Sequence, residues 1–303
     1  MSIIFGPVAS RRFGSSLGID LSPNAKCCNF DCLYCELAKA KAVNTITNPP
    51  SVDEVISELK KAISEFGETC VLTLTANGEP TLYPHLKELI AEINKLKTTQ
   101  KTLILSNGSG AMNERILDSL KELDIVKFSL DSVIAKTFRK IDRSLENIDL
   151  KVLVANMAAF KKSFKGELVM ESLILEGIND SEDELKALNI AFNEIKPDRV
   201  DISTLDRPPA HESAKAISEE KLRYLASFII SAPVFVATRN LRLEPKNLSK
   251  DEILKLLALR PQSKNDVEQG FSTLAKKNLN ELLESGKVKI QSCANLEFYK
   301  IQG

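Results

Sequence analysis

The sequence predicts an α/β fold in which a mostly parallel sheet forms an incomplete, TIM-like barrel, followed by a small C-terminal domain. The first observation is a regular alternation, from Leu17 to about Ala237, of short β-branched runs and longer stretches with helical periodicity. Such alternation is typical of parallel strands joined by helices on the outer face of a sheet. The second observation is a change of pattern near Glu244-Pro245-Lys246-Asn247, after which helices come first and two strand-like runs come last.

The expected strands are short and rich in β-branched residues. Six or seven such runs fit a partial (β/α)6 barrel better than a closed eight-fold one, although periodicity alone does not separate a barrel from an open sheet. The runs are Leu17–Leu21, Val71–Thr75, Thr102–Leu105, Ile125–Leu130, Leu168–Leu175, Arg199–Thr204 and Val234–Val236.

The expected helices lie between these strands. Two of them open with a capping box, Ser51 to Glu54 and Ser181 to Glu184, in which a serine hydroxyl and a glutamate carboxylate satisfy free amide groups. The helical stretches are Val52–Phe66, Leu86–Leu96, Ile116–Leu123, Leu150–Phe164, Leu185–Ile195 and Leu222–Ile230.

The boundary near Glu244 divides the chain into residues 1–243 and 244–303. A third capping box at Ser249 opens a helix through Leu259, and two further helices and a strand pair follow. The expected ranges of these later elements are Asn265–Phe271, Thr273–Leu283, Lys287–Gln291 and Leu296–Ile301. Three helices and a hairpin in about sixty residues resemble a winged helix-turn-helix.

The composition is that of an ordinary globular protein, with 43% hydrophobic and 27% charged residues. Lys+Arg 41 balance Asp+Glu 41, so no global charge draws the chain to nucleic acid or membrane. The N-terminus lacks a secretory pattern, and the longest apolar stretch, Leu222 to Val236, is too short and interrupted to span a bilayer. We expect a cytoplasmic protein without a membrane partner.

The strongest chemical signal is a cluster of three cysteines after the first expected strand. Cys28, Cys32 and Cys35 follow CxxxCxxC spacing, with Tyr34 directly before the last. A cubane iron–sulfur cluster has four irons, normally held by four thiolates, so three clustered thiolates suggest a cluster with one open iron. A zinc knuckle completed by Cys27, His85 or His211 is the alternative, and a disulfide is a weaker one.

Polar segments follow the next strands at the points where they end, which is where parallel α/β folds bind ligands. The segment Gly78-Glu79-Pro80 comes after the second strand, Ser106-Asn107-Gly108 after the third and Asp131 after the fourth. The alternatives are a surface turn, a strand-end turn and a helix N-cap, respectively. Glu171, inside the fifth strand, needs a partner if it points into the barrel.

Together these motifs resemble the radical S-adenosylmethionine (SAM) enzymes, and the fold then implied is the partial radical SAM barrel. The resemblance implies that Cys28, Cys32 and Cys35 hold a [4Fe–4S] cluster whose open iron is chelated by SAM. It further implies that Gly78, Glu79 and Pro80 hold the amino group of SAM. The other cofactor-binding residues that we expect are Ser106, Asn107, Asp131 and Tyr34.

Two further segments resemble a subgroup related to the wyosine-forming tRNA enzymes. They are the lead-in Gly6-Pro7-Val8-Ala9-Ser10-Arg11-Arg12-Phe13-Gly14 and the corner Arg207-Pro208-Pro209. Arg11, Arg12 and Arg207 are anion-binding candidates, with ion pairing to Asp20, Asp206 or Glu212 as the alternative. The chain departs from those enzymes because no cysteine precedes Cys27, so a second cluster and the wyosine reaction are in doubt.

The resemblance implies a 5′-deoxyadenosyl radical that abstracts a hydrogen atom from a tRNA or other RNA base, with flavodoxin or ferredoxin as electron donor. Lys276, Lys277, Lys287 and Lys289 of the winged-helix-like domain are candidates for phosphate contacts, although such a domain can equally bind protein. One alternative is a radical SAM enzyme acting on a peptide or protein. Another is a non-enzymatic Fe–S redox regulator that binds DNA through the winged helix.

Overall fold

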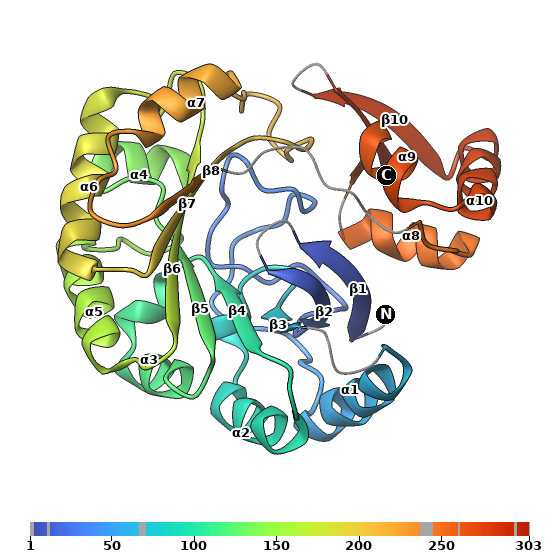
Figure 1. Cartoon of the computed structure of the whole chain (residues 1–303), viewed down its shortest axis with the longest axis horizontal. Helices are drawn as coiled ribbons and strands as arrows, with labels where there is room; N and C mark the ends of the chain where they lie inside the picture. The colour runs from blue at the N-terminus through green and yellow to red at the C-terminus, as the bar shows by residue number, and fades with distance from the viewer. Residues whose placement is uncertain are drawn as a thin grey trace.

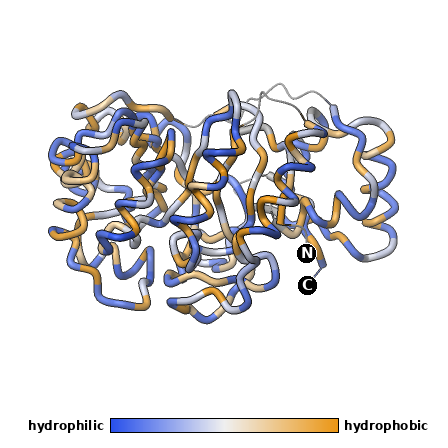
Figure 2. Tube along the Cα trace, turned by 90° about the horizontal axis from the view of Figure 1, so that it is seen from below, coloured by the Kyte–Doolittle hydropathy of each residue, from blue (hydrophilic) through white to orange (hydrophobic). Residues whose placement is uncertain are grey.

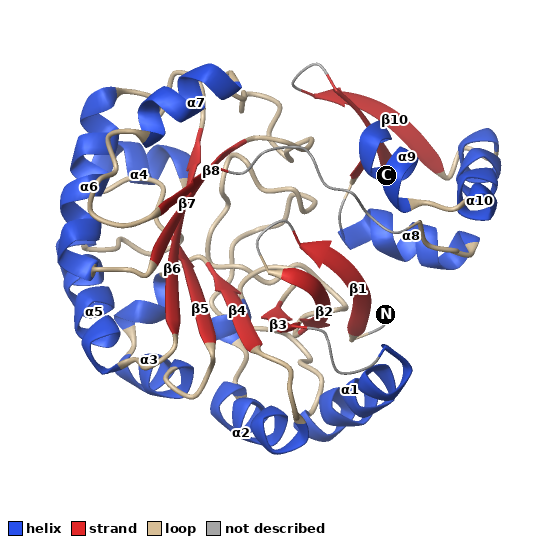
Figure 3. Cartoon of the chain, in the orientation of Figure 1, coloured by secondary structure: helices blue, strands red, loops and turns tan. Residues whose placement is uncertain are grey.

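The computed structural model describes residues 3–10, 13–66, 71–236, 245–259, 261–293 and 296–302. Within these ranges one large sheet carries helices on its outer face, and a second unit with its own small sheet follows it (Figure 1). The strands of the large sheet are curved, with the helices outside them (Figure 3). No helix in the described ranges is long and apolar enough to cross a membrane.

The large sheet has eight strands in the order β1-β2-β3-β4-β5-β6-β7-β8, and the pairings from β2 to β8 are all parallel. This arrangement confirms the expected α/β class with a mostly parallel sheet. Strands β1 and β8 are its two edges, so the barrel is open between them. The strands are β1 (Ile4–Ser10), β2 (Gly14–Asp20), β3 (Val71–Thr75), β4 (Thr102–Ser106), β5 (Ile125–Ser129), β6 (Glu167–Ile174), β7 (Arg199–Thr204) and β8 (Val234–Val236).

The helices between the strands are amphipathic, and hydrophilic and hydrophobic residues alternate along them (Figure 2). In α1 the residues Val55, Leu59 and Ala62 lie on one stripe that is buried against the sheet. The helices are α1 (Val52–Phe66), α2 (Leu86–Leu96), α3 (Glu114–Leu120), α4 (Ala135–Ile141), α5 (Leu150–Ser163), α6 (Glu182–Ile195) and α7 (Glu219–Ala226), with 3-10 turns at η1 (Pro80–Leu82) and η2 (Ser109–Met112).

Two strands and one helix were absent from the sequence prediction, besides the 3-10 turns η1 and η2. Strand β1 pairs antiparallel with β2, and its register shifts between Phe5 and Val8, around the Gly6-Pro7 pair that conceals the strand in the sequence. Helix α4 has only seven residues, and its N-cap Ile134 makes no capping hydrogen bond through its side chain. The two-residue strand β9 (Gln262–Ser263) is too short to have a periodicity.

The C-terminal unit contains three helices and a three-stranded antiparallel sheet of order β10-β11-β9. Its buried apolar residues, among them Ile253, Phe271 and Leu279, form a cluster separate from that of the barrel. The unit lies on the β1 side of the large sheet, and Lys246 Nζ donates to the carbonyl oxygen of Pro7 (Figure 1). Its elements are α8 (Lys250–Leu259), α9 (Lys264–Gly270), α10 (Thr273–Glu284), β10 (Val288–Cys293) and β11 (Leu296–Ile301), with β9 between α8 and α9.

The lower part of the barrel interior is closed by apolar side chains. Leu103, Ile125 and Val169 from neighbouring strands form one buried cluster, against which Phe13 and Val71 pack. Charged side chains begin at the same level, since Glu167 stands opposite Ile125 and both Lys127 and Arg199 stand opposite Val169, and they continue toward the carboxyl ends with Glu171 and Asp201. An apolar cluster and partly exposed charged side chains therefore share the base of the interior.

Candidate active site

The cysteine loop is joined by its backbone to the turn that follows β3. Cys27 N donates to the carbonyl oxygen of Asn77 at 2.9 Å, and Glu79 N donates to the carbonyl oxygen of Cys27 at 2.9 Å. Between these two bonds lies Gly78 at φ +139, where an added Cβ would lie 1.8 Å from the carbonyl oxygen of Cys27. Only glycine fits here, because both the dihedral and the contact exclude a side chain.

The three candidate ligands differ in their surroundings. Cys28 Sγ accepts from Phe30 N at 3.4 Å and lies 3.8 Å from Asn107 Nδ2. Cys32 Sγ lies 3.6 Å from a carboxylate oxygen of Asp142. Burial raises the pKa of the Cys28 thiol to about 12, and burial with nearby negative charge raises that of Cys32 well above its usual value.

The three thiols lie close enough together to serve as ligands of one multinuclear cluster. All thiolates of a zinc site lie about 2.3 Å from one ion, whereas each cubane thiolate binds a different iron. No group of three or more His, Cys, Asp or Glu among the described residues converges on a single-ion site, although the three thiols are close enough to affect one another's charge. Cys27 is buried in the core, and His211 Nε2 lies 3.0 Å from Asp31 Oδ1.

The buried carboxylate of Glu79 organises the second and third predicted segments. Its oxygens accept from Thr81 N at 3.0 Å, Thr81 Oγ1 at 2.6 Å, Ser106 Oγ at 2.8 Å and Asn107 N at 2.7 Å. Burial nevertheless raises the pKa of Glu79, against the lowering effect of these bonds. Asn107 Nδ2 in turn donates to Asn29 Oδ1 at 2.8 Å, which links the segment to the cysteine loop.

Tyr34 and Asp131 meet directly, although they are far apart in the sequence. Tyr34 Oη donates to Asp131 Oδ2 at 2.5 Å, and Leu173 N donates to Asp131 Oδ1 at 2.7 Å. The alternative that Asp131 caps a helix is wrong, since the N-cap of α4 is Ile134. Burial raises the pKa of Asp131 to about 6, and Glu171 contributes to the rise. Burial also raises the pKa of the neighbouring Asp142 well above its usual value, and Asp131 adds to this rise.

The structure thus places all the predicted site residues that follow β2, β3, β4 and β5 in one region at the carboxyl ends of the strands. The arginine candidates have a different outcome. Arg207 is buried and lies 3.5 Å from Glu36 and 3.9 Å from Asp206, so ion pairing engages it. Arg11 and Arg12 lie outside the described residues.

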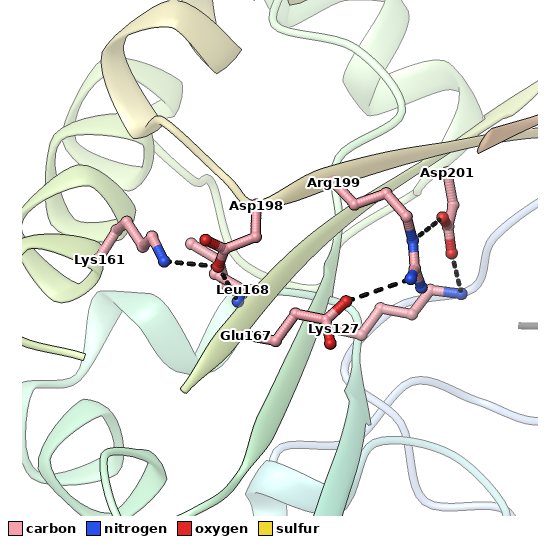
Figure 4. Close-up of polar contacts among 7 residues, drawn as sticks. All are labelled: Lys127, Lys161, Glu167, Leu168, Asp198, Arg199 and Asp201. Atoms are coloured by element: carbon pink, nitrogen blue, oxygen red, sulfur yellow. Dashed lines mark hydrogen bonds and ion pairs between the residues drawn. The ribbon is translucent and has the colours of Figure 1, made fainter. Parts of the chain in front are cut away.

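Sequence reasoning missed the charged layer inside the barrel. Lys127, on β5, is 4% exposed, and its Nζ lies 2.6 Å from Glu171 Oε2 and 3.7 Å from Asp201 Oδ2. Arg199 joins Asp201 to Glu167 below it (Figure 4). A sequence signal was present, because Lys127 and Asp201 are charged residues inside expected strands. The same signal had singled out Glu171.

Comparison with known proteins identifies the class. The family model for the radical SAM superfamily matches residues 25–188, which include the cysteine loop and strands β3 to β6. A crystal structure of a radical SAM methyltransferase from Sphaerobacter thermophilus shares the fold, with a TM-score of 0.58 and 14% sequence identity. The match covers 74% of this chain and 67% of that one.

Relatives extend the match beyond the family model. A protein named UPF0026 protein from Helicobacter pylori is 40% identical over 300 residues, covering 98% of this chain and 97% of its own. A S-adenosylmethionine-dependent nucleotide dehydratase from Flammeovirga pacifica is 28% identical over 57% of each chain. The chain belongs to the radical SAM superfamily, whose enzymes use a [4Fe–4S] cluster and SAM.

Replacing Gly78 with alanine is expected to disrupt the site. The added Cβ would meet the Cys27 carbonyl at 1.8 Å, so we expect Gly78→Ala to lower the free energy of unfolding by about 3 kcal/mol or more. Thermal unfolding of the protein without cofactors and iron content after reconstitution are the measurements.

Gly177→Ala is the matched control, because Gly177 has φ +68 with open space around its Cβ position. It should lose only about 1 to 2 kcal/mol from the left-handed backbone. Equal losses in the two variants would show that the contact with Cys27 is unimportant.

Asp131→Asn is expected to stabilise the cofactor-free protein at alkaline pH. The folded-state pKa of about 6 lies above the ordinary value of 3.8, so the folded state holds its proton more tightly and wild-type stability falls as pH rises from about 4 through 6. The variant lacks this loss, which is on the order of 3 kcal/mol at pH 8.

Thermal unfolding of both proteins at pH 5 and pH 8 tests this expectation, with Asp118→Asn as an exposed control. The advantage of Asp131→Asn should be larger at pH 8. A variant less stable than wild type at pH 8 would mean that the bonds from Tyr34 and Leu173 outweigh burial.

Proposed function

We propose that this radical SAM enzyme cleaves SAM reductively and modifies a tRNA or other RNA base. Cys28, Cys32 and Cys35 hold the [4Fe–4S] cluster in this proposal, and SAM binds beside Gly78, Glu79, Pro80, Ser106, Asn107, Asp131 and Tyr34. When bound, the cluster and SAM supply the 5′-deoxyadenosyl radical that abstracts a hydrogen atom. Flavodoxin or ferredoxin is the proposed electron donor, and the reducing cytoplasm is the proposed location.

The observation that carries the proposal is the convergence of the cysteine loop with two polar segments. Glu79 binds Ser106 and Asn107, and Asn107 reaches both Asn29 and the sulfur of Cys28. The Glu79 carboxylate is therefore engaged in fixing these segments. It positions the backbone of Gly78 and Pro80 and the amide of Asn107 next to the cysteine loop, where backbone and amide groups can bind the amino and carboxylate groups of SAM.

The proposal of a nucleic-acid substrate is supported by the relative named as a nucleotide dehydratase and by the C-terminal unit, which we propose to be a winged-helix-like domain spanning residues 244–303. On its hairpin, Lys289 lies directly opposite Lys300. Like charges at opposed positions destabilise a hairpin. None of the ion pairs found among the described residues includes Lys289 or Lys300. A phosphate group of RNA would offset the repulsion between these two positive charges.

The alternative of a peptide or protein substrate differs in one measurable respect, since such an enzyme would not need to bind RNA. The redox-regulator alternative loses its basis, because the chain belongs to an enzyme family. The same membership favours the cluster over the zinc knuckle.

The radical reaction can be tested without knowing the substrate. After anaerobic reconstitution with iron and sulfide, wild-type protein given dithionite and SAM should release 5′-deoxyadenosine, assayed by chromatography. The variant in which Cys28, Cys32 and Cys35 are all alanine should release none. A wild-type protein that holds a cluster but never cleaves SAM would contradict the proposal.

RNA binding by the hairpin can be tested with unfractionated tRNA. Replacing Lys289 and Lys300 with alanine should weaken binding and reduce the slope of log affinity against log salt by roughly 2, since each lost phosphate contact removes about one counterion. Lys264→Ala is the control, because Lys264 already pairs with Glu297. Unchanged affinity and slope in the double variant would count against this surface, and an active enzyme without tRNA affinity would favour a peptide substrate.

A further inference from the structure

Lys26 lies against the sulfur of one candidate cluster ligand. Its Nζ donates to Cys35 Sγ at 3.2 Å. Its charge also acts on the neighbouring Cys28 thiol, where it opposes the larger effect of burial on the pKa. A lysine in a polar loop is ordinarily solvated, and nothing in the sequence distinguished Lys26 from Lys39 or Lys41 of the same loop.

The backbone explains why Lys26 points toward the thiols. Cys27 forms a parallel bridge with Gly78 and buries its own side chain in the core. Cys27 is buried, whereas Lys26 and Cys28 on either side of it are only half-buried, and Cys28 also packs partly against the core. Cys35 is held separately, because Ala210 N donates to its carbonyl oxygen at 2.7 Å. The ammonium and the sulfur are therefore each positioned by an anchored backbone.

Carboxyl groups of the described residues also act on two of the three thiols. Glu79 acts on Cys28, and Asp131 and Asp142 act on Cys32. An electron added to a cluster in this setting brings further negative charge close to these carboxyl groups. A cation and an N–H···S hydrogen bond at a ligand sulfur favour the reduced state, because net charge and hydrogen bonds to sulfur set the potential of such clusters.

We propose that Lys26 makes the reduction potential of the [4Fe–4S] cluster less negative and thereby eases its reduction. The inference rests on the proposed ligand set of Cys28, Cys32 and Cys35. In the reduction step one electron passes from the flavodoxin or ferredoxin donor to the oxidised cluster, while Lys26 keeps its proton and no bond is broken. Lys26 acts through a ligand, so it is a positioning residue.

A redox titration of reconstituted protein, monitored by electron paramagnetic resonance, tests the inference. Lys26→Met removes the charge at similar length, and its midpoint potential should shift to a more negative value. Lys26→Arg restores the charge and should return the midpoint toward wild type. Lys26→Gln retains a donor without charge and separates the hydrogen bond from the electrostatic effect.

Lys39→Met is the matched control, because Lys39 is an exposed lysine of the same loop, and it should leave the midpoint unchanged. Equal midpoints for wild type and Lys26→Met at equal iron content would overturn the inference. The inference would also be overturned if Lys26→Met and Lys26→Gln both lost iron while unfolding like wild type without cofactors. Lys26 would then be needed to retain the cluster and not to set its potential.

Failure of the proposed ligand set has a different signature. In that case the wild-type protein holds no cluster, or the triple cysteine variant holds one as well. The midpoint potentials of the Lys26 variants are compared only if the wild-type protein holds a cluster and the triple cysteine variant does not. Failure of the ligand set and failure of the Lys26 inference are therefore distinguishable.

Discussion

The close backbone approach of Cys27 to Gly78 is the constraint on which the site depends. Two hydrogen bonds join a loop after β2 to a turn after β3, and the absence of a side chain at Gly78 allows them. This bridge places Cys28 beside Asn107 and orients Lys26 toward Cys35. It also brings Glu79 into the position from which its buried carboxylate gathers Thr81, Ser106 and Asn107.

Much of the fold follows from local pattern. The parallel strands and the longer helices were predicted because each buries an apolar stripe or run that periodicity makes visible, as α1 and β3 do. Strand β1 was missed because Gly6 and Pro7 interrupt it, and α4 because its short length and uncapped start leave no local signal. The domain division, the winged-helix identity and the ligand roles remain predictions, since they concern shape and partners that local pattern does not encode.

The site itself was predictable to a different extent. Motif spacing located the cysteines and the strand-end segments, because those groups are close in sequence or share the edge of one sheet. The contacts between distant groups were not predictable. Tyr34 meets Asp131 across 97 positions of sequence, and Lys127 meets Glu171 and Asp201 only because three neighbouring strands stand in a particular register. Such pairings depend on strand register and tilt, which no single segment specifies.

The distribution of buried charge separates structural from functional demands. Near the base of the barrel, Leu103, Ile125 and Val169 form the apolar cluster that stability alone would favour. Above it, Lys127 and Asp201 are buried with ion-pair partners, and such pairs seldom stabilise a fold more than apolar side chains would. Asp131 and Asp142 are buried side by side, and burial raises the pKa of both, while Asp131 raises the pKa of Asp142 further. Since this arrangement opposes stability, and since it adjoins the cysteine loop through Tyr34 and Cys32, its retention is best explained by the chemistry of the site.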